Sequence, residues 1–155
     1  MGNNYRLLKD RHQKEVNELP YMFAFNDEQF KNGLKKLGLN ENETNKLIYF
    51  GAGIYLKKVD LPKVEEVHAR HKKELEFEIK SDTIGDKFIK DMFLDEMYNH
   101  EYGYTRDIQP VLEALNISEN NLRHSENLRN GLMLAKQVFE EKEQEQEDIE
   151  EEIEI

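Results

Sequence analysis

Residues 85–105 read GDKFIKDMFLDEMYNHEYGYT and form the densest run of large apolar side chains in this 155-residue sequence. Apolar residues recur here at spacings of three and four, which place side chains on one face of a helix. The stripe consists of Ile84, Phe88, Ile89, Met92, Phe93 and Met97. We therefore expect a helix with one buried face, capped by Ser81 or Asp82. Gly103 can adopt the left-handed conformation that ends helices, so the helix should stop there.

The rest of the chain predicts a small sheet and further helices around this central helix. Aromatic and β-branched runs predict antiparallel strands over residues 23–25, 47–50 and 54–56. The glycines of Gly51-Ala52-Gly53 indicate a tight turn between the last two strands, and a phosphate-binding loop is the alternative. The sequence therefore predicts an α+β fold, mainly helical, with about five or six helices packed on a small antiparallel sheet of two or three strands. Besides the central helix, we expect helices at residues 5–19, 27–37, 61–80, 107–115 and from residue 125.

The composition is that of a soluble protein, with 35% charged and 37% hydrophobic residues. There is no run of about 18 apolar residues, and no basic segment followed by an apolar one, so we expect neither a membrane span nor a secretory signal. We expect a cytoplasmic protein that does not associate with membranes. The sequence has no cysteine, which excludes disulfides, thiolate zinc sites and cysteine nucleophiles.

The net charge of −11 is concentrated at one end of the chain. Residues 140–155 contain ten acidic residues and one lysine, whereas residues 1–139 contain 23 acidic and 21 basic residues. We therefore expect one globular domain over residues 1–139 and an acidic low-complexity tail over residues 140–155. As an isolated segment, the tail should be a frayed continuation of the last helix or disordered.

Direct binding to nucleic acid is disfavoured, because the sequence lacks the clustered lysine and arginine that phosphate backbones require. Residues 107–130 imitate a helix-turn-helix, but their recognition helix would be residues 119–124, with Arg123 as its only full positive charge.

Two features predict contacts with another protein. Tyrosines surround the end of the central helix, and such rings bury area at low entropic cost. The acidic tail could imitate the charge of nucleic acid and attract a basic surface. The predicted contact residues are Tyr98, Tyr102, Tyr104, Glu140, Glu141 and Glu143. The alternatives are that the tyrosines cover the core and that the tail keeps the protein soluble.

A group of imidazoles and a carboxylate forms a second candidate site. His68 and His71 are three residues apart on one predicted helix, and Glu96 and His100 are four apart on another. If these pairs came together, they could bind zinc, iron or manganese. The alternative is a structural network in which His71 and Glu96 satisfy each other, because structural networks also bury ionisable groups.

The order of these segments resembles a family of small uncharacterised proteins from Firmicutes and their phages and mobile elements. The likeness covers Tyr21 to about Val138, and its most specific part is residues 88–107, around Asn99-His100-Glu101-Tyr102. It is carried by MFAFNDEQFKNGLKKLGL, YFGAGIYLKK, HARHKKELE, GDKFIKDMFLDEMYNHEYGYTRD and LEALNIS. The resemblance implies a domain of unknown function, a cytosolic setting and a phage or mobile-element context. It supplies no catalytic residue, and the acidic tail lies outside it.

We therefore expect a non-enzymatic phage or mobile-element accessory protein that binds another protein, and its most concrete form is an anti-CRISPR-like inhibitor of a host defence system. No cofactor is expected. The alternative is a small metal-dependent enzyme that uses a divalent metal at the histidine and glutamate cluster. The sequence leaves open whether the chain forms oligomers through its last helix.

Overall fold

The computed structural model describes residues 3–154 and divides the chain into two compact units. Unit 1 contains the residues up to Asp10 and those from Glu74 onward, and unit 2 contains Arg11–Lys73. The boundaries fall within two helices, α1 (Asn4–Asn17) and α3 (Leu61–Ser81). One globular domain over residues 1–139, followed by an acidic tail, stays a prediction.

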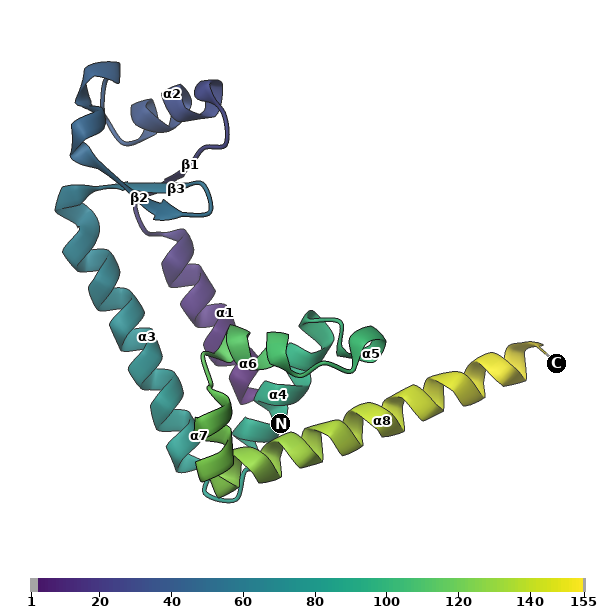
Figure 1. Ribbon diagram of the computed structural model, residues 1–155. Helices are drawn as coiled ribbons and strands as arrows, with labels where there is room; N and C mark the ends of the chain where they lie inside the picture. The colour runs from purple at the N-terminus through teal and green to yellow at the C-terminus, as the bar shows by residue number, and fades with distance from the viewer. Residues whose placement is uncertain (1–2, 155) are drawn as a thin grey trace. The chain divides into compact units, whose positions relative to one another are not determined.

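Unit 2 is built on a three-stranded antiparallel sheet in the order β1-β3-β2 (Figure 1). The strands are β1 (Tyr21–Phe23), β2 (Leu47–Gly51) and β3 (Ile54–Lys57). The connecting elements are α2 (Asp27–Lys36) and the 3-10 helices η1 (Glu41–Lys46) and η2 (Lys58–Asp60). The predicted α+β class and the small antiparallel sheet are confirmed.

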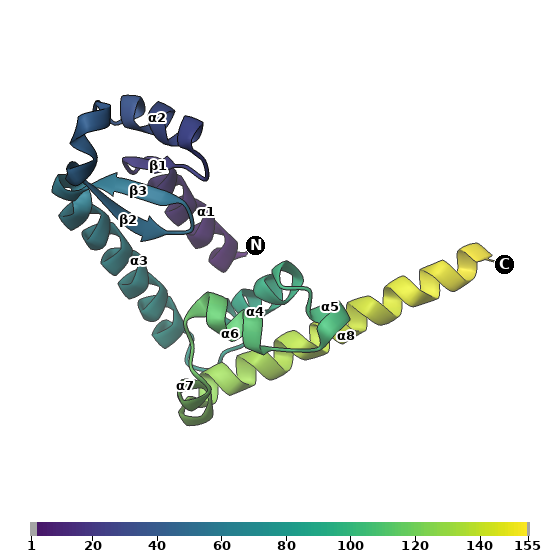
Figure 2. The same cartoon turned by 45° about the horizontal axis from the view of Figure 1, so that its top comes forward.

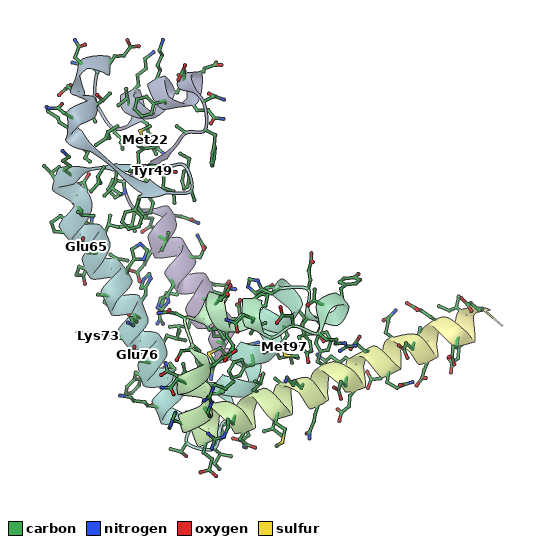
Figure 3. The ribbon with its side chains drawn as sticks, in the orientation of Figure 1. Met22, Tyr49, Glu65, Lys73, Glu76 and Met97 are labelled. Atoms are coloured by element: carbon green, nitrogen blue, oxygen red, sulfur yellow. The ribbon has the colours of Figure 1, made fainter. Side chains whose placement is uncertain are left out.

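Both faces of the sheet are covered within unit 2. On one face, Tyr21 of β1 and Ile48 of β2 are paired with Leu56 of β3, so the three side chains share that face. Tyr21 and Leu56 belong to a core cluster made with Leu19, Val64 and Val67, and the partly buried Ile48 packs against it. On the other face, Met22 lies against α2 (Figure 3), where a Cβ at Gly33 would come within 2.6 Å of its side chain.

The β2–β3 turn explains the glycines that the sequence singled out. Gly51, Ala52 and Gly53 all have positive φ, which short hairpin loops require. The amide of Gly53 donates a hydrogen bond to the hydroxyl of Tyr49 over 3.3 Å. A Cβ at Gly53 would lie 2.5 Å from the ring of Phe25, so that ring covers the turn.

The first strand lies earlier than the sequence predicted. We expected residues 23–25, but β1 is Tyr21–Phe23, and Phe25 is 74% exposed. The reason is the start of α2. Asn26 accepts a hydrogen bond from the amide of Gln29, and the side chain of Gln29 accepts one from the amide of Phe25 over 2.8 Å. This amide therefore serves the helix cap instead of the sheet.

Unit 1 is helical and is centred on the contact between α4 (Phe88–Asn99) and α8 (Glu126–Glu154), as Figure 2 shows. Shorter helices α5 (Tyr102–Thr105), α6 (Gln109–Leu115) and α7 (Glu119–His124) surround it. Met97, labelled in Figure 3, is fully buried. The core is Tyr5, Leu8, Phe88, Ile89, Met92, Phe93, Met97, Tyr102, Val111, Leu112, Leu115, Ile117, Leu128, Leu132, Ala135 and Phe139.

The start of α4 corrects one position of the predicted apolar stripe. Ile84 is 61% exposed and precedes the helix, whereas the rest of the stripe is buried. The cause is Asp82, whose buried carboxylate accepts hydrogen bonds from the amides of Gly85, Lys87 and Ile89 at 3.0–3.1 Å. These bonds fold the chain into a loop before Phe88. Neither Ser81 nor Asp82 occupies the predicted N-cap position, which is Lys87, but the carboxylate of Asp82 does accept a hydrogen bond from the amide of Ile89 in the first turn of α4.

The end of α4 differs as well. The left-handed residue there is Glu101, with φ of 58°, and not Gly103. Gly103 lies within α5, where a Cβ would be 3.3 Å from the ring of Phe139. The lack of a side chain at Gly103 therefore leaves room for the ring of Phe139.

Within residues 3–154 there are eight α-helices, more than the five or six predicted. The excess comes from short helices, α5 and α7, which have too few residues to show a helical period. The predicted acidic tail is a helix, because α8 continues to Glu154.

Candidate functional site

Phe139 of α8 joins two of the three predicted contact tyrosines. Its ring centroid lies 5.0 Å from that of Tyr98 and 5.2 Å from that of Tyr102, the latter edge to face. Tyr102 is buried and is part of the core. Tyr98 is 51% exposed, and Tyr104 is 91% exposed. Tyr98 and Tyr104 are therefore the two tyrosines of this group that a partner can reach.

Two basic residues tie this aromatic group to the beginning of the acidic segment. Arg106 Nη2 donates a hydrogen bond to Glu143 Oε2 over 2.8 Å, and the guanidinium of Arg106 lies 5.6 Å from the Tyr102 ring centroid. The hydrogen bond to Glu143 raises the pKa of Arg106. Lys142 Nζ lies 5.9 Å from the centre of the Tyr98 ring. Burial, followed by the charge of Glu143, raises the pKa of Tyr98.

The predicted acidic contact residues divide into two kinds. Glu140 and Glu141 are exposed, whereas Glu143 is partly buried against Arg106. Beyond Glu143, every described residue of α8 is exposed, and no other element of unit 1 lies beside this part of the helix (Figures 1 and 2). Two isoleucines in this uncovered segment, Ile149 and Ile153, are 51% and 78% exposed.

Glu96 is at the centre of a buried polar network. The hydroxyl of Tyr5 donates a hydrogen bond to Glu96 Oε1 over 2.8 Å, and Lys9 Nζ donates to the same oxygen. His100 Nε2 lies 3.1 Å from Oε2, and the side-chain Nδ2 of Asn99 donates a hydrogen bond to Oε1 over 3.4 Å. The carboxylate of Glu96 is 3% exposed, so these contacts replace the water that burial removes.

The environment keeps Glu96 ionised. Burial raises its pKa, but the hydrogen bonds from Lys9 and Tyr5 outweigh this effect, so the pKa of Glu96 is lowered overall. Burial and the hydrogen bond to Glu96 raise the pKa of Tyr5. A saturated, ionised carboxylate holds α1 against α4 within unit 1. Neither of its oxygens is left without a partner.

The predicted histidines have separate partners in unit 2. His68 is exposed, and its Nε2 lies 2.8 Å from the hydroxyl of Tyr21. His71 stacks on His12 with ring centroids 3.8 Å apart, and its Nε2 lies 3.5 Å from Glu15 Oε1. The expected pairing of His71 with Glu96 is therefore replaced by pairing with Glu15.

Glu15 and His71 have shifted pKa values with identifiable causes. Arg70 donates two hydrogen bonds to Glu15, and this interaction is the main reason that the pKa of Glu15 falls to about 2. Burial, followed by the charge of His12, lowers the pKa of His71. These residues join the part of α1 in unit 2 to α3.

The residues predicted to bind a metal thus belong to different polar networks. Glu96 and His100 are brought together in unit 1, and His68 and His71 each contact other residues of unit 2. Across residues 3–154, no group of three or more His, Cys, Asp or Glu side chains is arranged to hold a metal ion. A metal site that combines the two pairs stays a prediction.

Several residues of these networks were not identified from the sequence. Nothing in the sequence around Tyr5 and Lys9 indicates that they bind Glu96, and nothing around Arg106 indicates that it lies beside the tyrosines. Phe139 lies in a segment for which the sequence predicted only a helix from residue 125. The heptad spacing of α8, described below, was present in the sequence and could have revealed the uncovered isoleucines.

Comparison with known proteins gives a family but no activity. Residues 4–138 match a family of unknown function, DUF7659. No curated protein and no solved structure matches the chain. In the described part of the chain, no helix is both long enough and apolar enough to cross a membrane.

Proposed function

Since the chain belongs to a family of unknown function, DUF7659, we propose its role from its surface: it is a non-enzymatic accessory protein that acts by binding another protein. The observation that carries this proposal is the uncovered end of α8. A helix segment that buries nothing in its own fold gains little from tertiary packing, which is the main source of helix stability in proteins. The exposed Ile149 and Ile153 would gain by contact with a partner.

The exposed tyrosines extend the proposed contact surface toward the body of unit 1. Tyr98 is half-exposed beside Lys142, and Tyr104 is almost fully exposed. Tyrosine is enriched where proteins bind one another, because a rigid ring covers area at low entropic cost. We therefore assign Tyr98 and Tyr104 to the contact surface, together with Glu140, Glu141 and the helix that follows.

In its most concrete form, the proposed protein is carried by a phage or mobile element and inhibits a host defence system. The resemblance to small phage and mobile-element proteins supports the context. The ten acidic residues after Phe139 support a partner with a basic surface, because opposite charge speeds encounter.

The test is affinity capture with the tagged full-length protein and a version ending at Gln144. This end keeps the contacts of Lys142 and Glu143 and removes only uncovered helix. We expect a stoichiometric partner with the full-length protein and its loss with the shortened one. Circular dichroism and thermal unfolding of both proteins provide the control for folding. If neither protein retains a partner, the proposed function is wrong.

A metal-dependent enzyme is the second candidate, and one observation favours it. Glu96 is a buried, ionised carboxylate with His100 Nε2 3.1 Å from its Oε2. A divalent metal would have to displace the hydrogen bonds that Tyr5 and Lys9 give to this carboxylate, which makes the candidate the weaker one.

A further inference from the structure

The uncovered part of α8 keeps the heptad register of the buried apolar stripe and becomes apolar again at Ile149 and Ile153. In the first half of α8, the stripe follows alternating steps of four and three, and all its members are buried. These members are Leu128, Leu132, Ala135 and Phe139. The same steps then lead to Lys142, Gln146, Ile149 and Ile153. This is the heptad pattern by which one helix packs along another.

The positions on both sides of the uncovered stripe are all glutamate. With Phe139 at heptad position a, positions e and g are occupied by Glu143, Glu145, Glu150 and Glu152. Residues at e and g meet the partner helix in a coiled coil and determine which partner pairs. Glu143 is engaged by Arg106, whereas the other three are exposed.

Resting on the proposed function, we infer that residues 142–153 of α8 bind a basic amphipathic helix of the partner, with lysine or arginine flanking its apolar stripe. The isoleucines at positions 149 and 153 are the apolar anchors, and Glu145, Glu150 and Glu152 pair with the basic residues. Two anchors bury little apolar area, so the interaction depends strongly on charge and weakens as salt rises.

The charges argue against two other occupants. A second copy of this helix would bring glutamates at e and g against glutamates, and like charges at these positions are unfavourable. A basic cleft built for nucleic acid would use the acidic residues on every side of the helix and would not need Ile149 or Ile153. Substitution of Ile149 and Ile153 therefore distinguishes between the two kinds of partner, because only binding to a helix should weaken.

The test uses the full-length protein and a fluorescent synthetic peptide of about three heptads, with isoleucine at a, leucine at d and lysine at e and g. A second peptide of the same composition has its apolar residues shuffled. Binding is measured by fluorescence anisotropy at low and at physiological salt. We expect the patterned peptide to bind about tenfold more tightly than the shuffled one, because only it presents a continuous apolar stripe.

Three variants of the full-length protein locate the contact. Ile149→Gln with Ile153→Gln keeps every charge and should weaken binding by about tenfold or more. Glu145→Gln, Glu150→Gln and Glu152→Gln together should weaken it by about tenfold. The matched control, Glu147→Gln, Glu151→Gln and Glu154→Gln, removes the same charge away from the stripe. It should weaken binding by only about two- to threefold through the long-range field.

Equal losses in the two glutamine triple variants, or no loss in the isoleucine variant, would overturn the inference and leave a non-specific acidic surface. Circular dichroism of each variant checks that α8 remains helical. The inference and the proposed function can fail separately. If capture from a lysate yields a partner that the isoleucine variant still retains, protein binding stands and the helical contact is wrong.

Discussion

Gly131 of α8 lies so close to Ile89 of α4 that a Cβ at position 131 would be 2.3 Å from the Cγ2 of Ile89. The same Cβ would lie 2.7 Å from the carbonyl oxygen of Gly85. The absence of a side chain at position 131 therefore allows the two main helices of unit 1 to approach each other.

Gly131→Ala should lower the free energy of unfolding by about 1–3 kcal/mol, because the methyl group overpacks the α4–α8 contact. Helix propensity alone predicts the opposite sign, a gain of about 1 kcal/mol. Urea unfolding followed by circular dichroism measures the change. Gln137→Ala, at an exposed position of the same helix, is the control and should leave stability nearly unchanged. A Gly131→Ala protein as stable as the original would contradict the close contact.

Asp82→Ala should destabilise unit 1 by about 1–2 kcal/mol, because two amides in the loop before α4 and the amide of Ile89 in its first turn lose their acceptor. Thermal unfolding is a suitable measurement. Asp86→Ala removes an exposed carboxylate from the same loop and is the matched control. If both variants lose the same stability, the loss of a negative charge from the loop explains the effect, and the hydrogen bonds of Asp82 do not.

Glu96→Gln should lower stability by about 1–3 kcal/mol, because it removes the charge that Lys9 and Tyr5 stabilise in a buried position. The lowered pKa of Glu96 sets the pH dependence. Its contribution is complete above the ordinary value of 4.5 and is lost as pH falls through the lower pKa of the folded protein. Urea unfolding over a pH series should show this acid loss in the original protein and a reduced loss in Glu96→Gln. Tyr5→Phe, which keeps the carboxylate, should preserve part of the pH dependence.

Unit 2 should lose stability as pH falls below 6.5, the ordinary pKa of histidine, because the folded protein resists protonation of His71. Glu15 stays ionised far below this range, since its pKa is about 2, so it does not cause the loss. Urea unfolding at about pH 7.5 and about pH 5.5 tests the expectation. His71→Gln should reduce the difference between the two conditions, whereas His124→Gln, on the exposed surface of α7, should not. An unchanged difference in His71→Gln would assign the effect to another group.

The metal content of the purified protein tests the alternative that it is a metal-dependent enzyme. Under the proposed binding function, full-length protein purified without chelator should contain no stoichiometric zinc, iron or manganese when analysed by inductively coupled plasma mass spectrometry. His100→Ala should then lower thermal stability without changing metal content. Stoichiometric metal that disappears in His100→Ala would instead favour the enzyme.

The sequence predicted the elements whose signals are local. The strands at residues 47–50 and 54–56 and the buried face of α4 each follow from a few neighbouring residues, and the structure shows all of them. Side-chain period and capping chemistry act over one or two turns, so they can be read without knowing the rest of the fold.

The misplaced features depend on contacts between segments. Ile84 does not belong to the helical stripe, because the carboxylate of Asp82 accepts hydrogen bonds from amides as far along the chain as Ile89 and so holds the intervening residues in a loop. Gly103 was predicted to end the helix through its backbone conformation, whereas in the structure a side chain at this position would crowd the ring of Phe139, far away in the sequence. The choice of Glu15 and His12 as partners of His71 likewise depends on how two helices pack. Hydrophobic period alone cannot supply such pairings.

The β1-β3-β2 order has a consequence for how unit 2 folds. Strands β2 and β3 are joined by the short turn at residues 51–53, so their pairing closes a small loop, and hairpins of this kind form within about 1–10 microseconds. Strand β1 reaches β3 only across α2 and η1, which makes its pairing a long-range event with a larger entropic cost. The β2–β3 hairpin should therefore form first, and Tyr21 and Met22 of β1 should pair with β3 afterwards. Substitutions in the turn should slow folding, whereas substitutions in β1 should chiefly speed unfolding.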